Sequence, residues 1–401
     1  MPNKNGRLVA LVASIAVAAV AIGAALAYRQ GPQAAQADAA PLSGSPSPAS
    51  LTPTPTATPT PISSATPSTT PVVSPKPPSS APVTSSGPTT ITLNVAKLPK
   101  GRAPQMPYLI DRTVLGGAGY DAKIPGSGGV VGIGRLDSAV LAVVLADDGT
   151  ELVKLGPGDE VRHTPNVSSL VTAPDQSMAA YAAASISSLG RATKGGTLYA
   201  ENFGSVKSLK LPDAWNLQVL SYVGGKVYYR AGAAESGGWK LYTWAPGTAT
   251  PDLVTTVTSP TAVSDDGKLA ASAQLINDGG SCSSVVEVAS GKQLFRTCEN
   301  MISDFTPDGS VAVGEPDYGD GYCSLKQTAL DARTGKVIRE WKGCFHRTVA
   351  EDDQHFLLVA VASGGGGDPG TKSAIIRCAI NTGSCELATS ISTDKALALG
   401  R

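Results

Sequence analysis

Charged and aromatic side chains are both scarce in this sequence. Of its 401 residues, 16% are charged and 5% are aromatic, whereas 44 are glycine and 30 are proline. Because glycine and proline interrupt helices, this composition argues against a helical protein. The 32 basic residues equal the 32 acidic ones, and such a chain lacks the basic surface that nucleic-acid binding requires. We therefore predict no nucleic-acid partner.

Histidine is also rare, and the common catalytic motifs are missing. The three histidines are His163, His346 and His355, and there is no H-E-x-x-H, G-x-S-x-G or G-x-x-x-x-G-K-[ST] motif. Residues 315–321 gather three carboxylates in a glycine-rich run. Their spacing fits no known calcium loop, so we interpret the run as an exposed hairpin tip. We predict no catalytic, cofactor-binding or metal-ligating residues.

Residues 8–28 form an uncharged apolar run that is long enough to span a bilayer. As a helix the run reaches about 30 Å, the thickness of the hydrocarbon core. Lys4 and Arg7 precede it, so the positive-inside rule places residues 1–7 in the cytoplasm and the rest of the chain outside. A cleaved signal peptide is the alternative, but its apolar region is usually shorter. We favour a single-pass anchor in the cell membrane, with secretion as the alternative.

Residues 29–90 have the composition of an extended tether. Between positions 41 and 90 there are 14 prolines, 12 serines and 11 threonines, with Lys76 as the sole charge. Such a segment has almost nothing apolar to bury, and its prolines favour the polyproline II conformation. We predict a disordered stalk that holds the following domain, residues 91–401, away from the membrane.

The remainder of the chain reads as short strands separated by turn residues. Apolar or alternating runs at 138–145, 226–229 and 356–361 are bounded by Gly, Asp, Asn and Pro, which is typical of strands and tight hairpins. Turn signals recur at a nearly constant interval, with 42 positions from Asp266 to Asp308 and 45 from Asp308 to Asp353. This interval is the length of a four-stranded propeller blade. The predicted fold class is therefore an all-β propeller.

Two of these turns also carry a family resemblance. The segments FTPDGSVAVG at 305–314 and VSDDGKLAAS at 263–272 resemble the repeat motif of bacterial TolB-like and WD-repeat-like propellers. The resemblance extends over about residues 107–395, although the WD and GH dipeptides of eukaryotic WD repeats are missing and Gln176 replaces the glycine after Asp175. The motif is structural, so the resemblance implies a fold and no active site.

Six pairs of turns between residues 130 and 387 define six blades. A seventh requires residues 107–125 to supply two outer strands and residues 396–400 to supply an inner strand, so that the two ends of the domain close the ring. We favour seven blades, with six as the alternative.

All six cysteines lie in the last third of the chain. An even number of cysteines in an exported domain indicates disulfides, and six cysteines allow 15 pairings. Because each neighbouring pair flanks a predicted hairpin turn, we predict Cys282–Cys298, Cys323–Cys344 and Cys378–Cys385. A zinc site is the alternative, but no C-x-x-C motif occurs.

Aromatic residues concentrate between positions 215 and 244. We interpret most of them as blade packing, with an aromatic binding surface for sugar or peptide as the alternative.

Taken together, these features predict a membrane-tethered, extracytoplasmic β-propeller of the bacterial cell envelope. Its expected activity is binding of an unidentified envelope protein or glycan. The alternative is a cell-surface hydrolase or lyase, which requires acidic or histidine side chains that converge at one mouth of the ring.

Overall fold

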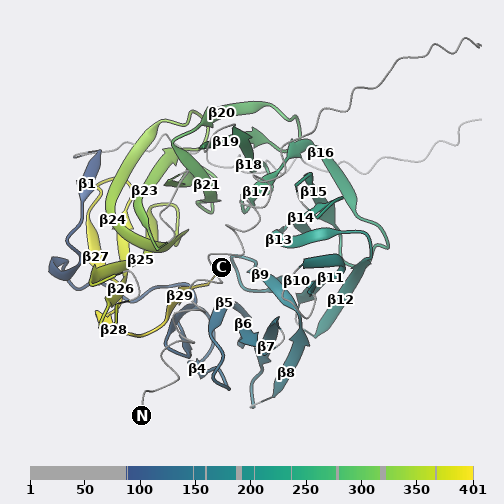
Figure 1. Cartoon of the computed structure of the whole chain (residues 1–401), viewed down its shortest axis with the longest axis horizontal. Helices are drawn as coiled ribbons and strands as arrows, with labels where there is room; N and C mark the ends of the chain where they lie inside the picture. Colours follow the sequence, from purple (N-terminus) through teal and green to yellow (C-terminus); the bar gives the residue numbers. More distant parts are fainter. Residues whose placement is uncertain are drawn as a thin grey trace, which may run out of the picture.

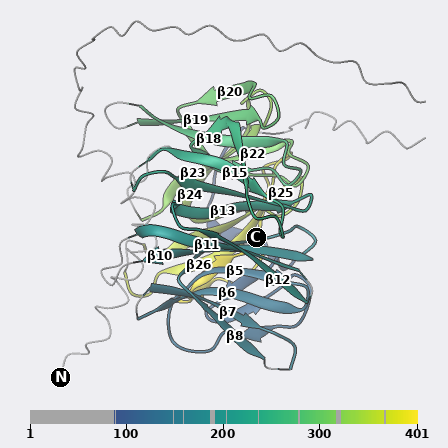
Figure 2. The same ribbon diagram turned by 90° about the vertical axis from the view of Figure 1, so that its right-hand side faces the viewer.

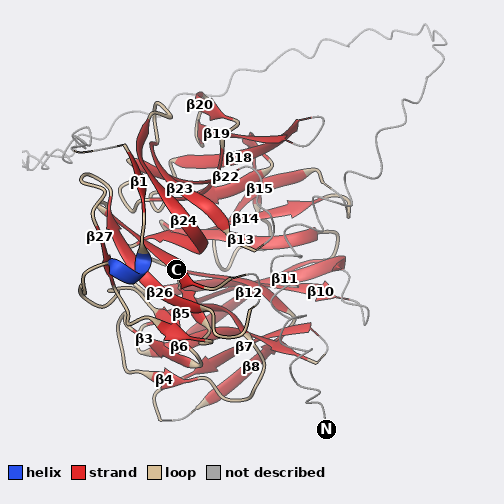
Figure 3. Ribbon diagram, turned by 60° about the vertical axis from the view of Figure 1, so that its left-hand side comes forward, coloured by secondary structure: helices blue, strands red, loops and turns tan. Residues whose placement is uncertain are grey.

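The structure is a computed structural model that describes residue 87 and residues 89–400, except for 148, 159, 187–191, 203, 236, 277–279, 317–321 and 366–367. The anchor predicted at 8–28 and nearly all of the predicted stalk lie outside the described residues. In the part that is described, no helix has the length and apolar character needed to cross a membrane. The only described helix is the short 3-10 turn η1 (Val95–Lys97), drawn in blue in Figure 3.

The described chain is therefore almost entirely β, as predicted, and its sheets surround a common axis (Figure 1). Five antiparallel sheets have four strands each. The first contains β29 (Leu397–Leu399), β2 (Tyr108–Ile110), β3 (Thr113–Leu115) and β4 (Ala122–Lys123). The second contains β5 (Val130–Leu136), β6 (Ala139–Ala146), β7 (Gly149–Leu155) and β8 (Val161–Pro165).

The next three sheets follow in chain order. One contains β9 (Val167–Thr172), β10 (Met178–Ile186), β11 (Ala192–Asn202) and β12 (Ser205–Leu211). One contains β13 (Trp215–Val223), β14 (Lys226–Gly232), β15 (Trp239–Trp244) and β16 (Asp252–Thr258). One contains β17 (Pro260–Val263), β18 (Leu269–Ile276), β19 (Gly280–Glu287) and β20 (Gln293–Thr297). Figure 2 shows the sheets from the side of the ring.

The sixth sheet has nine strands. It contains β21 (Asn300–Phe305), β22 (Val311–Pro316), β23 (Ser324–Asp331), β24 (Val337–Ala350), β25 (His355–Ser363), β26 (Lys372–Ala379), β27 (Cys385–Leu387), β28 (Ser392–Thr393) and β1 (Thr90–Thr92). The long strand β24 connects its two halves, since residues 337–345 pair with β23 and residues 345–350 pair with β25. The short strand β1 runs parallel to β24 along residues 340–342.

The repeating turns form as the sequence predicts. Ser264 Oγ donates to Asp266 Oδ1 at 2.7 Å, and Asp266 Oδ1 also accepts the backbone N–H of Lys268 at 2.9 Å. Gly267, which lies between Asp266 and Lys268, has φ +70°, a conformation that favours glycine. Thr306 and Asp308 repeat the hydroxyl–carboxylate bond at 2.8 Å. These side chains fix the register of the strands that follow them.

Small apolar side chains allow adjacent sheets to pack face to face. In one core cluster, Ala180 and Ala182 of β10 lie with Leu217 of β13 and Tyr229 of β14. Because strand side chains alternate between faces, every second residue of a central strand reaches such a cluster. The hydrophobic core is therefore divided among the spaces between successive sheets.

The two ends of the described chain complete one sheet. Tyr108 of β2 faces Leu399 of β29, and Leu109 faces Ala398. The pairing expected between residues 396–400 and residues 107–125 is therefore present. The sequence predicted two strands within 107–125, whereas the structure has the three short strands β2, β3 and β4 there.

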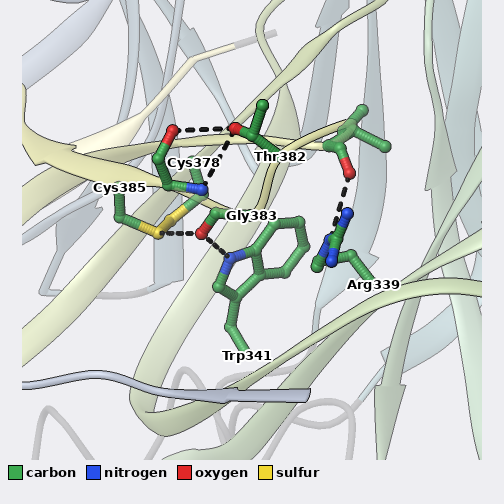
Figure 4. Close-up of a disulfide and its surroundings, with 8 residues drawn as sticks. Arg339, Trp341, Cys378, Thr382, Gly383 and Cys385 are labelled. Atoms are coloured by element: carbon green, nitrogen blue, oxygen red, sulfur yellow. Dashed lines mark hydrogen bonds between the residues drawn. A yellow bond between two sulfur atoms is a disulfide. The ribbon is translucent and has the colours of Figure 1, made fainter. Parts of the chain in front are cut away.

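The six cysteines are joined in the three pairs expected from their spacing. Cys378 of β26 faces Cys385 of β27 directly across the hairpin. Figure 4 shows this disulfide beside Gly383, whose carbonyl accepts a 3.0 Å bond from Trp341 Nε1. The turn carried by this disulfide is thus also attached to β24, the strand along which β1 lies.

Candidate functional site

Polar side chains that are not part of the turns gather at one end of the ring, on inner strands and on second or third strands of four successive sheet segments. In each sheet the inner strand and the second strand are antiparallel. The first residues of the inner strand therefore lie on the same side of the ring as the last residues of the second strand. At this end lie six residues that we call the polar arc: Arg230, Trp239, Thr261, Ser303, Glu315 and Arg347. They come from β14, β15, β17, β21, β22 and β24.

Arg230 occupies the first position of the polar arc. Its Nη1 donates to the carbonyl of Pro260, in the next sheet, at 3.2 Å. Its guanidinium carbon lies 4.5 Å from the ring centre of Trp239, within the range of a cation–π contact. Burial lowers the pKa of Arg230 to about 10.

Hydroxyl groups continue the arc from sheet to sheet. Thr261 Oγ1 donates to the carbonyl of Ile302 on β21 at 2.9 Å. The next residue, Ser303, is exposed, and its hydroxyl donates to Glu315 Oε1 at 3.2 Å. Hydrogen bonds of the arc thus cross two sheet boundaries, one from Arg230 to Pro260 and one from Thr261 to Ile302.

A carboxylate and a guanidinium form the last part of the arc. Burial raises the pKa of Glu315, while the Ser303 hydrogen bond and the charge of Arg347 act in the opposite direction. Burial likewise lowers the pKa of Arg347, whereas the charge of Glu315 raises it. The Arg347 side chain still reaches solvent, so these two charges are both accessible and surrounded by protein, a combination typical of functional sites.

A disulfide holds an aromatic pair next to the arc. The rings of Tyr322 and His346 meet edge to face, with centroids 5.1 Å apart. Burial lowers the pKa of His346, which favours the neutral imidazole. Cys323 and Cys344 are bonded to each other and adjoin this pair in sequence. The disulfide therefore fixes the strand that carries His346 and Arg347 relative to Tyr322.

The arrangement suits noncovalent binding of a polar ligand better than covalent catalysis. A serine nucleophile needs an imidazole or similar base at hydrogen-bond distance, whereas the Ser303 hydroxyl is bonded to a carboxylate. The His163 ring lies 3.1 Å from Glu151, and the His355 ring lies 2.9 Å from Asp352. In the described part of the chain, neither of these pairs has a hydroxyl or thiol as a further partner.

A second polar cluster lies in a hollow of about 230 Å³ lined in part by Lys154 and Arg162. The carboxylate of Glu201 is only 3% exposed; it is bound by Lys154 and lies 3.8 Å from Arg162. The Tyr181 hydroxyl donates to it at 3.4 Å. Because these charges satisfy one another, the cluster is accounted for as a contact between two neighbouring sheets.

The predicted aromatic cluster is mainly core. Tyr222, Tyr229 and Trp244 are buried, and Tyr229 stacks on Tyr242 at 5.3 Å. Trp239 differs from these because its partner is a cation. The packing interpretation therefore holds for most of the cluster, and Trp239 contributes to the polar arc.

The predicted disulfide cysteines adjoin the arc only at Cys323 and Cys344, and sequence reasoning missed the arc itself. Of its members, Glu315 belongs to the acidic run 315–321, most of which lies outside the described residues. Arg230 and Trp239 belong to the aromatic-rich segment 215–244, which the sequence indicates mainly as blade packing. An available signal for Arg230 was its position inside the apolar strand β14, where a charged residue is costly unless it has a partner or a role.

Comparison with known proteins gives structural similarity only. In sequence, the chain matches no protein-family profile and no curated protein. An uncharacterized protein from Listeria monocytogenes is similar over 74% of this chain and 85% of its own, with 11% identity and a TM-score of 0.44.

Two named proteins show similar levels of likeness. TolB from Acinetobacter baumannii is similar over 63% of this chain and 66% of its own, with 14% identity and a TM-score of 0.41. Prolyl oligopeptidase B from Galerina marginata is similar over 73% of this chain and 52% of its own, with 11% identity and a TM-score of 0.45. The chain thus spans about half the length of the oligopeptidase. At these values the likeness assigns no activity to the chain.

Proposed function

We propose that this protein is a membrane-tethered, extracytoplasmic β-propeller that binds a component of the bacterial cell envelope through the polar arc. The ligand is a protein or a glycan. In this proposal, residues 8–28 anchor the chain, residues 29–90 act as the stalk, and the following domain carries the binding site.

The proposed ring has seven blades. Five of them are the four-stranded sheets, and the nine-stranded sheet supplies two more. The division falls within β24, where pairing with β23 gives way to pairing with β25 at Phe345. Residues before this point form the outer strand of the sixth blade, and residues after it form the inner strand of the seventh.

The observation that carries the binding role is the polar arc. Ser303 and Arg347 are exposed on inner strands, where most residues are buried or half-buried. Side chains held in fixed positions at one end of a rigid ring are suited to recognition. Three disulfides support an oxidising compartment outside the cytoplasm.

Site-specific crosslinking in intact cells tests the binding role. A photo-crosslinking amino acid replaces Ser303 in the full chain, and in a matched control it replaces Leu325, which is 63% exposed on β23. We expect a discrete adduct from position 303 and none from position 325. Equal labelling from both positions, or none from position 303, would contradict binding at the arc.

Fractionation of the same cells tests the tether. We expect the full chain to remain in the membrane fraction after alkaline carbonate washing and to be degraded by protease added outside the cytoplasmic membrane. Release by carbonate, or protection from external protease, would contradict the proposed anchor and orientation.

A further inference from the structure

Within the described chain, the half-buried Arg230 has fewer hydrogen-bond partners than the buried Arg377 and Arg135. Arg377 uses its guanidinium to bind the carboxylates of Glu351 and Glu386 and two backbone carbonyls. Arg135 donates to two carbonyls and also lies in the field of Asp121. Arg230 has one hydrogen-bond acceptor within the described chain, the carbonyl of Pro260. Desolvation is the sole effect acting on its pKa among the described residues.

Two hydrogen-bond donors at this place have no acceptor. Arg230 Nε and Trp239 Nε1 are both buried, and neither has a hydrogen-bond partner within the described chain. The two side chains belong together, since the guanidinium lies over the indole ring at 4.5 Å. Among the described residues, this position therefore combines a positive charge that has no ion-pair partner with two N–H groups that have no acceptor.

Such a combination is unfavourable in the free protein. A buried donor without an acceptor loses its bonds to water and gains nothing in return, and a desolvated cation without a counter-charge adds to that cost. The cation–π contact with Trp239 and the bond to Pro260 compensate for only part of it. The missing elements are an acceptor oxygen and a negative charge.

We propose that Arg230 and Trp239 form a recognition site for a carboxylate group of the ligand. A carboxylate is planar and accepts two parallel N–H bonds from one guanidinium. Its single charge matches the single charge of Arg230. The inference deepens the proposed function, on which it rests, by assigning the chemistry of the ligand.

Calorimetry on the full chain in detergent tests this assignment with defined probes. Two oligomers carry the carboxylates, one an oligogalacturonate and the other an oligoglutamate. Their neutral counterparts are an oligogalactose and an oligoglutamine, and inorganic phosphate is a further probe. We expect one carboxylate oligomer to bind and its neutral counterpart not to bind, and the oligomer that binds identifies the source as an acidic glycan or an acidic peptide.

Three variants connect the binding to the site. Arg230→Gln removes the charge and the paired donors, and we expect it to weaken binding by about tenfold or more, the effect of losing a charge-assisted bond. Trp239→Phe keeps an aromatic ring but removes the indole N–H, and we expect a smaller loss of about threefold to tenfold. Arg333→Gln, at an exposed turn, makes the same change of net charge and should leave the affinity unchanged.

The assignment is overturned if neither carboxylate oligomer binds, if phosphate binds as well as they do, or if Arg230→Gln and Arg333→Gln behave alike. Trp239→Phe keeps the test decisive if Arg230→Gln fails to fold, as judged by circular dichroism. Crosslinking from position 303 is independent of these results. An adduct there without carboxylate binding rejects this inference and leaves the proposed function standing.

Discussion

Arg377 and Glu351 form a two-bonded ion pair that is almost completely removed from solvent. Their side chains are 3% and 0% exposed, and Arg377 Nη2 donates to Glu351 Oε1 at 2.8 Å. The same carboxylate oxygen accepts the backbone N–H of Gln105 at 2.7 Å, and Arg377 donates to the carbonyls of Arg102 and Ala103. The pair thereby binds the segment that leads from β1 into the ring.

Breaking this ion pair should lower the free energy of unfolding substantially. Glu351→Gln leaves the Arg377 charge in place without its main counter-charge, and such changes destabilise proteins by about 3–5 kcal/mol. Urea unfolding followed by fluorescence measures the loss. Glu299→Gln, at an exposed position, is the matched control and should change the free energy of unfolding by less than about 0.5 kcal/mol. A similar small change for both variants would show that the pair does not hold the segment.

Gly383 should tolerate a side chain much less well than another turn glycine. It has φ +78°, and an added Cβ would lie 2.1 Å from Cδ1 of Ile91 in β1. Gly158 has φ +82° but open space around it, so Gly158→Ala measures the backbone strain alone, about 1 kcal/mol. We expect Gly383→Ala to cost more than Gly158→Ala, by about 1–3 kcal/mol, because the side chains of Ile91 and Arg339 must shift from their packed positions.

Limited proteolysis reports on the same pair of variants. Gly383→Ala should accelerate cleavage near residues 87–93, and Gly158→Ala should not. Equal cleavage rates in the two variants would mean that β1 is not held by contact with this turn.

Each disulfide should stabilise the folded protein by an amount that increases with the length of chain it encloses. The sequence separations are 7 for Cys378–Cys385, 16 for Cys282–Cys298 and 21 for Cys323–Cys344. Loop-closure entropy then gives contributions of about 2.3, 3 and 3.3 kcal/mol, respectively. Paired Cys→Ala replacements and equilibrium unfolding test the order, and a largest loss at Cys378–Cys385 would contradict it.

Glu315 should make stability depend on pH in a direction opposite to that of most carboxylates. Burial raises the pKa of Glu315 above the ordinary value of 4.5. The stability that this group contributes is therefore fully present below pH 4.5 and is lost as the pH rises through the raised pKa. Glu315→Gln should therefore gain stability relative to the wild type as the pH rises above this value.

Thermal unfolding across this pH range measures the difference. Glu235→Gln, an exposed change elsewhere, serves as the control and should keep the wild-type profile. If Glu315→Gln loses stability relative to the wild type with rising pH, the attraction of Arg347 outweighs the burial of the carboxylate.

The features predicted correctly from the sequence are those decided by neighbouring residues. The turns at Asp266 and Asp308 are readable because a hydroxyl, a carboxylate and a glycine act within five positions. The disulfides are readable because each hairpin places its own two cysteines on facing strands, as at Cys378 and Cys385.

The polar arc could not be predicted in this way. Its members lie on six strands and extend over more than a hundred positions, from Arg230 to Arg347. They become neighbours only when successive sheets pack around the axis, and strand periodicity does not reveal which end of the ring a side chain occupies. The strand β1 was missed for a related reason, since its parallel partner begins about 250 positions later at Glu340.

The pairing of β29 with β2 has a consequence for how the molecule is made. The strand partner of Tyr108 is Leu399, which lies 291 positions later in the chain. Long-range pairing of this kind is slow because the loop must close before its contacts form. A chain still being synthesised or exported has an open edge on β2, and such edges pair readily with other strands. The protein is therefore most exposed to aggregation just before its last strand emerges, and a chaperone that shields β2 at that moment would raise the yield of the closed ring.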